Sequence, residues 1–191
     1  MGSAHKIILS MCDHSGNWPK FYREAGYDVR SLDLKKGYDI RLLPFVDENV
    51  YGILAAPPCT VFANSGARWH RTEDDIREGL ALVDACLRAV VIYRRTLKFW
   101  SLENPVGKLT QYLGEPTMRF NPCDFGDPYT KKTCLWGDFV IPAPLFVSTP
   151  AVEPVNGSQM WAKWGGKSEK TKEARSITPL GFAKAFFEVN Q

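Results

Sequence analysis

A cysteine placed directly after two prolines is the part of this sequence that most clearly indicates chemistry. Cys59 follows Pro57 and Pro58, which in turn follow residues 51–54, a short apolar run typical of a buried strand. Because each proline ring fixes its own φ and the second restricts the residue before it, the backbone leading to the thiol is stiff. A thiolate on a rigid turn at a strand end is aimed in advance at its target, so the pattern favours a catalytic nucleophile.

A carboxylate follows a second strand-like run further along the chain. Residues 99–102 are apolar and end immediately before Glu103. Between the two runs, Thr72 begins a long amphipathic pattern, with Asp75 placed to complete a capping box. A helix that crosses over between two parallel strands leaves both strand ends at the same edge of the sheet. We therefore expect Cys59 and Glu103 to face one pocket and to support covalent catalysis with acid assistance.

The histidines do not supply the partner that a cysteine hydrolase needs. Only His5, His14 and His70 occur, and none lies in a recognisable cysteine–histidine signature. Glu103 is the better partner for Cys59, which points away from hydrolysis. The alternatives are structural: a buried free thiol for Cys59, and a helix cap or an ion pair with a lysine for Glu103.

The beginning of the chain has the element order of a doubly wound α/β fold. Residues 6–12 predict a first strand, residues 13–17 a turn that contains a glycine, and residues 18–25 a helix. Gly26 suits the end of that helix, where a positive φ is wanted. Residues 27–33 alternate as a second strand. Strand, turn, helix and strand in this order open a doubly wound, largely parallel sheet.

The carboxyl half of the chain has a different composition. Residues 112–150 are rich in proline, glycine and aromatic residues and contain one strand candidate at 133–136. Residues 179–189 predict a last helix with apolar side chains on one face. We expect a single domain over residues 1–191, in which residues 138–174 form a loop-rich insert.

Composition excludes several classes of protein. The chain has 191 residues, of which 45% are hydrophobic and 24% charged, as in an ordinary globular domain. No apolar run approaches the roughly 20 residues that cross a bilayer, and the first residues lack the layout of a signal peptide. The net charge of +3 permits nucleic-acid binding without demanding it. Five cysteines without a Cys-x-x-Cys pair favour reduced thiols in the cytoplasm, and we expect no metal site.

Two ordered motifs carry a family resemblance. The Pro-Pro-Cys run that ends at Cys59 and the Glu-Asn-Pro run that begins at Glu103 resemble the Pro-Pro-Cys and Glu-Asn-Val signatures of the cytosine-5 DNA methyltransferases. The chain is especially similar to the short members of this family from bacteriophages, and the resemblance runs in order over residues 6–137. It implies a Rossmann-like sheet of the S-adenosylmethionine (SAM)-dependent methyltransferase type, and it implies the bacterial host cytoplasm as the location.

The resemblance also implies a cofactor site for SAM. The family binds SAM at the segment after the first strand, holds the ribose with an acid after the second strand, and reaches the adenine with an Asp-Ile pair. The corresponding cofactor-binding residues are Cys12, Asp13, Ser15, Gly16, Asp33, Asp39, Ile40 and Pro57.

The same resemblance implies the reaction. Cys59 would add to carbon 6 of cytosine while Glu103 supplies a proton at ring nitrogen 3, after which carbon 5 takes the methyl group and elimination frees Cys59. Lys131 and Lys132 lie where the family has an arginine, in a stretch that resembles Gly-x-Pro-Gln-x-Arg-x-Arg. The implied substrate-binding residues are Pro58, Asn104, Arg68 and Tyr129. The implied partner is DNA, whose target base leaves the duplex at a cost of about a few kcal/mol.

Two departures from the family keep other functions open. The family's Phe-x-Gly-x-Gly motif is reduced here to Gly16 alone, and residues 138–174 are too few for a separate target-recognition domain. The short insert would suit a free pyrimidine nucleotide, an RNA or single-stranded DNA as substrate. The reduced glycine motif favours a third hypothesis, a non-catalytic nucleic-acid-binding or anti-restriction protein that retains the fold.

Overall fold

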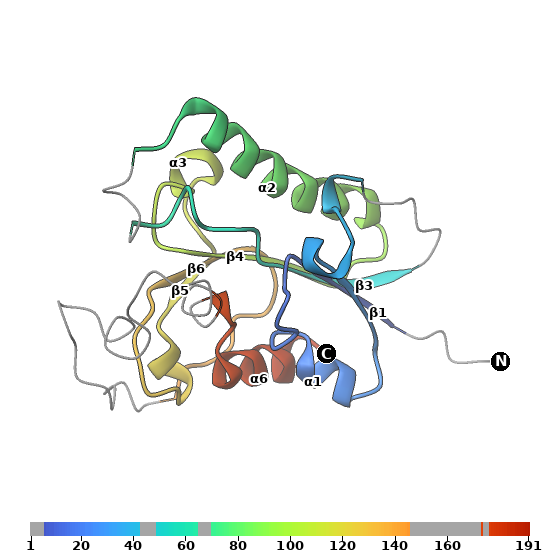
Figure 1. Cartoon of the computed structure of the whole chain (residues 1–191). Helices are drawn as coiled ribbons and strands as arrows, with labels where there is room; N and C mark the ends of the chain where they lie inside the picture. The colour runs from blue at the N-terminus through green and yellow to red at the C-terminus, as the bar shows by residue number, and fades with distance from the viewer. Residues whose placement is uncertain (1–5, 43–48, 65–69, 146–172, 174–175) are drawn as a thin grey trace.

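A six-stranded sheet forms the centre of the protein in a computed structural model that describes residues 6–42, 49–64, 70–145, 173 and 176–191 (Figure 1). The strands are β1 (Ile7–Met11), β2 (Asp28–Leu32), β3 (Val50–Ala55), β4 (Phe99–Pro105), β5 (Met118–Phe120) and β6 (Thr133–Asp138). The α-helices are α1 (Lys20–Glu24), α2 (Glu73–Tyr93), α3 (Thr110–Leu113) and α6 (Leu180–Val189). Short 3-10 helices are η1 (Leu34–Lys36), η2 (Ile40–Leu42) and η4 (Pro122–Phe125).

The sheet is mostly parallel but mixed. Its strand order is β2-β1-β3-β4-β6-β5, with parallel pairing from β2 through to β4 and antiparallel pairing of β6 with both β4 and β5. The predicted α/β class is therefore confirmed, and the arrangement is compatible with a Rossmann-like fold. Because β2 and β3 lie on opposite sides of β1, the strand order reverses there. In open α/β sheets, ligands bind outside the carboxyl ends of the strands at such a switch point.

Helix α2 connects β3 to β4, as the sequence predicts. Its capping box is present: Asp75 N donates to Thr72 Oγ1 at 3.1 Å, and Thr72 N donates to Asp75 Oδ2 at 2.8 Å. These two bonds satisfy amide groups that have no partner within the helix. The pairing of β3 with β4 is parallel, so both strands end at the same edge. The helix ends at Tyr93.

The two faces of the sheet bury different side chains. Helix α2 covers one face, and α1 and α6 lie together on the other (Figure 1). The core under α2 is largely aliphatic, with Val83 and Ala89 among its buried residues. The core under α1 and α6 is aromatic: Phe120 stacks on Phe182 with ring centroids 4.0 Å apart, and Trp18 meets Phe182 at 6.3 Å.

Asn190 ties α6 to the rest of the molecule. Its Oδ1 accepts a hydrogen bond from Val140 N at 2.8 Å, and its Nδ2 donates to Phe186 O at 3.0 Å. Its backbone oxygen accepts from the hydroxyl of Tyr22, in α1, at 3.0 Å. The helix predicted over residues 179–189 is thus confirmed as α6 and is anchored at its C-cap.

The structure extends the predicted elements in the carboxyl half. Strand β4 continues past Leu102 to Pro105, because β6 pairs with these residues in antiparallel register. The predicted strand at 133–136 is β6, whereas α3, β5 and η4 lie in a region for which the sequence predicted no other elements. Most of the predicted insert, residues 146–172, lies outside the described residues. Within the parts of the chain that the structure describes, no helix is both long and apolar enough to cross a membrane.

Candidate active site

Residues 56–64, which we call the nucleophile loop, follow β3 and carry Cys59. Where the loop begins, Ala56 N donates to Met11 O at the end of β1 over 2.9 Å. Asn104 Nδ2, on β4, donates to Pro57 O at 2.9 Å within the protein interior. The thiol lies on a partly exposed residue. Strands β1 and β4, which flank β3, therefore fix the backbone that carries Cys59.

The far end of the nucleophile loop is held as closely. Ala63 forms an antiparallel bridge with Gly107, and Lys108 N donates to Phe62 O at 2.8 Å. A Cβ atom added to Gly107 would lie 2.0 Å from Phe62 O, so only glycine permits this approach. Asn64 N also donates to the segment after β4. No motif predicted these contacts, although a lone glycine just after a strand is the kind of signal that marks close backbone approach.

Glu103 lies at the same edge of the sheet and is largely buried, with 9% of its surface exposed. Lys131 Nζ is 3.6 Å from Glu103 Oε1, and both side chains are well shielded from solvent. Glu103 is opposite Leu135 on β6, a residue of the aromatic core. Because directly opposite residues share a face, the Glu103–Lys131 pair belongs to the face of α1 and α6.

Asn104 takes the other face of the same strand. It lies opposite Cys134, which belongs to the aliphatic core under α2. Predicted as a substrate-binding residue, Asn104 is fully buried and uses its amide nitrogen to hold Pro57. Consecutive residues of β4 therefore point to opposite sides, one toward the nucleophile loop and the other toward Lys131.

Residues 12–17, which we call the β1 loop, follow the first strand. Cys12 has a φ of +57°, the one positive value at a non-glycine residue in the described part of the chain. Its amide donates to Leu32 O, at the end of β2, over 2.8 Å. The Cys12 side chain packs on the α2 side, where a hydrogen bond with Cys12, together with burial, raises the pKa of the Cys86 thiol. It is thus the backbone of Cys12, rather than its thiol, that shapes the loop.

Asp13 is the most informative residue of the β1 loop. Its Oδ1 accepts hydrogen bonds from Ser15 Oγ at 2.6 Å and from Gly16 N at 2.9 Å. Its Oδ2 is buried and has no hydrogen-bond partner among the residues described. A buried carboxylate oxygen without a donor is costly, because the lost hydration is not replaced. The loop therefore offers one acceptor to a ligand that carries an ammonium or hydroxyl group.

The acid predicted to hold a ribose lies where expected. Asp33 directly follows β2, is 9% exposed, and accepts a hydrogen bond from Lys35 N at 2.8 Å as the N-cap of η1. This bond uses one carboxylate oxygen.

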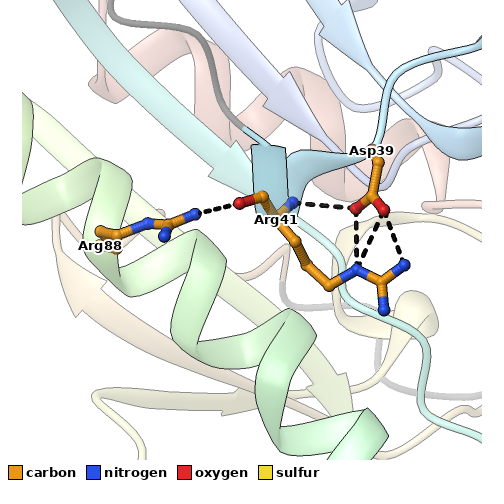
Figure 2. A network of polar contacts seen from close by, with 3 residues as sticks. All are labelled: Asp39, Arg41 and Arg88. Carbon is orange, nitrogen blue, oxygen red and sulfur yellow. Dashed lines mark hydrogen bonds and ion pairs between the residues drawn. The ribbon is translucent and has the colours of Figure 1, made fainter.

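The predicted Asp39–Ile40 pair has fewer groups available to a ligand than Asp13 and Asp33 have. Figure 2 shows the Asp39 carboxylate bound by Arg41, whose Nη2 lies 2.6 Å from Oδ2. These hydrogen bonds hold the pKa of Asp39 below its usual range. Arg88 of α2 donates to the backbone oxygen of Arg41 at 2.7 Å, which fastens this segment to the helix (Figure 2). Ile40 is buried in the core under α2.

The remaining predicted site residues are dispersed. Pro57 is buried and Pro58 is exposed at the start of the nucleophile loop. Tyr129 is buried, and burial raises the pKa of its hydroxyl above the usual range. Lys132 is exposed, and its backbone oxygen accepts from Val106 N at 3.0 Å. Arg68 lies outside the described residues.

The site thus combines a candidate nucleophile, a carboxylate paired with a lysine, and an acceptor that no described residue bonds, at one edge of an α/β sheet. None of the five cysteines forms a disulfide bond. In the described ranges, no three His, Cys, Asp or Glu side chains are grouped so that they could hold a metal ion. Neither the models of known protein families nor the curated proteins give a match to this chain.

Proposed function

We propose that this protein is a SAM-dependent methyltransferase that modifies carbon 5 of cytosine in DNA through a covalent adduct with Cys59. One observation carries the proposal: the 2.9 Å hydrogen bond from Asn104 to Pro57 joins the nucleophile loop to the strand of Glu103. The two motifs that resemble the cytosine-5 family are therefore in contact, although they are far apart in the sequence. The contact supports the proposal because covalent catalysis with acid assistance needs the loop of Cys59 and the strand of Glu103 side by side.

The residues at the ends of β1 and β2 fit the cofactor. Among the described residues no donor reaches Asp13 Oδ2, and SAM carries an ammonium group and ribose hydroxyls that could supply one. Asp33 stands at the end of the neighbouring strand with one oxygen engaged by Lys35. Both acids lie at the switch point of the sheet, where this class of fold binds ligands. When bound, SAM supplies an electrophilic methyl group.

The chemistry of the chain's own residues begins with Cys59. Its thiolate would form a bond to carbon 6 of cytosine, which moves the electron pair of the carbon 5–carbon 6 double bond toward ring nitrogen 3. Glu103 would pass a proton taken up from solvent to nitrogen 3, and Lys131, 3.6 Å from Oε1, would stabilise the carboxylate that remains. General acid assistance of this kind contributes about 10²- to 10⁴-fold to a rate.

The same residues would then release the product. Once carbon 5 is methylated, solvent removes its proton and the bond from carbon 6 to Cys59 breaks, which restores the double bond. Glu103 takes back the proton from nitrogen 3. Because the nucleophile loop is held by both neighbouring strands, the Cys59 sulfur can bond to carbon 6 and be released from it while the backbone of the loop keeps its position.

Transfer of labelled methyl groups from SAM tests the proposal. We would offer duplex DNA, single-stranded DNA, RNA and dCMP to the wild type and to Cys59→Ala. We expect label in DNA with the wild type and none with the variant, whose melting temperature should be unchanged. Label confined to RNA or dCMP would show that RNA or the free nucleotide, rather than DNA, is the substrate. Absence of label together with no thermal stabilisation by SAM would contradict the proposal and favour a non-catalytic binding protein.

A further inference from the structure

A surface cavity lies beside the candidate active site, between β5, η4 and the segment that follows β4. Its volume is about 260 Å³. It is lined by Val106, Arg119, Phe120, Asn121, Asp124 and Lys132. None of these residues has a role in the reaction proposed above, although Lys132 is one of the two lysines at the position of the family's arginine. The cavity therefore needs an explanation of its own.

The cavity and the active site share a wall. Lys131 and Lys132 are consecutive, and the first pairs with Glu103 while the second lines the cavity. Side chains of an extended backbone point alternately to opposite sides, so one short segment serves both places. The hydrogen bond from Val106 N to Lys132 O, 3.0 Å long, fixes this wall to the segment after β4. The cavity and Glu103 therefore lie on either side of one short segment.

The charges that line the cavity favour an anion. Arg119 and Lys132 supply two cations, and Lys132 forms no ion pair within the described residues. Asp124 is the one acidic residue of the lining, and its carboxylate already accepts a hydrogen bond from Asn121 N at 2.7 Å. The described lining thus has one more positive than negative charge, and the one carboxylate in it already has a hydrogen-bond donor.

Arg119 is available in spite of its present partner. Its Nη2 lies 2.5 Å from Glu115 Oε2, but the two side chains are 52% and 79% exposed. Ion pairs exposed to this degree contribute about 0–1 kcal/mol, so an anion that enters the cavity can compete for the guanidinium. A guanidinium with an ammonium group is a combination that binds phosphate oxygens well.

We propose that this cavity binds a phosphate group of the nucleotide strand that carries the target base. Its volume corresponds to about nine water molecules at roughly 30 Å³ each, which is enough for a phosphate group and some of its hydration. The proposal rests on the proposed function only in that the substrate is a nucleotide. It does not depend on methyl transfer.

Binding of a cytosine-containing single-stranded oligodeoxynucleotide, without SAM, tests this proposal. Affinity is measured over a series of salt concentrations for the wild type and for Arg119→Gln/Lys132→Gln. Each phosphate neutralised on a single strand adds about 0.7 to the slope of log affinity against log salt, and the cavity holds one phosphate, so the double variant should lose about 0.7. Lys132→Gln alone changes an exposed side chain and should lose part of this amount, even if the double variant folds poorly. Lys20→Gln/Arg77→Gln, on α1 and α2, removes two exposed charges elsewhere as a control.

A second arm with dCMP and deoxycytidine distinguishes the source of the phosphate. A smaller slope with the oligonucleotide supports a site for the strand. A loss of dCMP affinity with no change for deoxycytidine or for the oligonucleotide slope supports the same cavity as a site for a free nucleotide. Slopes and affinities equal to those of the control variant would overturn the proposal. If the wild type transferred no methyl group but the cavity variant had a smaller salt slope, the proposed reaction would be overturned and the phosphate site would still be supported.

Discussion

The nucleophile loop and the β1 loop follow adjacent parallel strands at one edge of the sheet, yet they are held in different ways. The nucleophile loop is bonded to both neighbours: to β1 through Met11, to β4 through Asn104, and to the segment after β4 through Gly107. The β1 loop is bonded to itself through Asp13 and to Leu32 at its start. It also makes two longer hydrogen bonds to other segments, from Lys36 Nζ to Asp13 O at 3.5 Å and from Asn17 Nδ2 to Thr178 O at 3.3 Å. It also retains a buried carboxylate oxygen with no partner among the described residues.

This difference separates the two tasks of a group-transfer site. A residue that attacks a substrate must be held before the substrate arrives, because loss of position by about 1 Å can cost 10²-fold in rate. A loop that binds a cofactor can leave polar groups unsatisfied, since the ligand completes them. We therefore expect changes in the nucleophile loop to reduce stability and activity together. Changes in the β1 loop should reduce ligand binding while the ligand-free protein stays stable.

Gly107→Ala should have the largest effect. The new Cβ would meet Phe62 O at 2.0 Å, and this atom belongs to the backbone and cannot rotate away. The nucleophile loop must then shift, so we expect methyl transfer to fall by about 10²-fold and the free energy of unfolding to fall by about 1–3 kcal/mol. Rates of label transfer and thermal unfolding measure both.

Gly16→Ala in the β1 loop is the matched control for that substitution. Gly16 has a φ of +69°, and the nearest atoms to an added Cβ belong to the flexible side chain of Arg23, 3.9 Å away. Only the strain of the left-handed conformation is introduced, about 1 kcal/mol. If Gly107→Ala were no more harmful to activity at saturating SAM than Gly16→Ala, the contrast between the two loops would be wrong.

Asn104→Ala should have the next largest effect. It leaves the buried oxygen of Pro57 without its donor, which costs about 1–3 kcal/mol of stability. Because the oxygen lies two residues before Cys59, we expect the rate of adduct formation with a 5-fluorocytosine substrate to fall by about 10-fold or more. Asn64→Ala, at an exposed position whose backbone amide makes the contact, serves as the control. Unchanged adduct formation in Asn104→Ala would show that this bond does not position the thiol.

Asp13→Asn should have the smallest effect on the protein and a selective effect on the cofactor. The amide retains Oδ1 as an acceptor for Ser15 and Gly16, and it removes a charged oxygen that lacks a partner. The melting temperature without ligand should therefore be unchanged or higher. The loss of a hydrogen bond to a charged group, about 1.5–3 kcal/mol, should weaken SAM binding by at least about 10-fold. A variant that SAM stabilises as strongly as the wild type would contradict this assignment.

The sequence predicted the amino-terminal part of the fold well, because local signals and tertiary packing agree there. The capping box of α2 is visible as Thr72 and Asp75, and the structure contains it. Gly26, predicted to end the first helix, has a φ of +87° and donates to Arg23 O. The apolar runs of β1 and β3 are buried on both faces, so they are recognisable without an alternating pattern.

The rest depended on partners far away in the sequence. Strand β4 includes Pro105, which removes a donor, and it continues only because β6 lies alongside. Strand β5 has three residues, too few to show a period. The roles of Asn104 and Gly107 depend on contacts with Pro57 and Phe62. A buried asparagine or a glycine after a strand does not identify which distant residue it contacts. The two motifs of the site could therefore be predicted from the sequence, but the hydrogen bonds and backbone contacts that join them could not.

The anchor at Asn190 has a consequence for how the protein is made. The hydrogen bond from Tyr22 joins residues that are 168 positions apart, so the aromatic face of the sheet is completed only when residue 190 has been synthesised. At translation rates of about 5–20 residues per second, the nascent chain carries this uncovered face for roughly 10–30 s. We expect the emerging chain to need a chaperone during that interval, and the need should end when α6 docks.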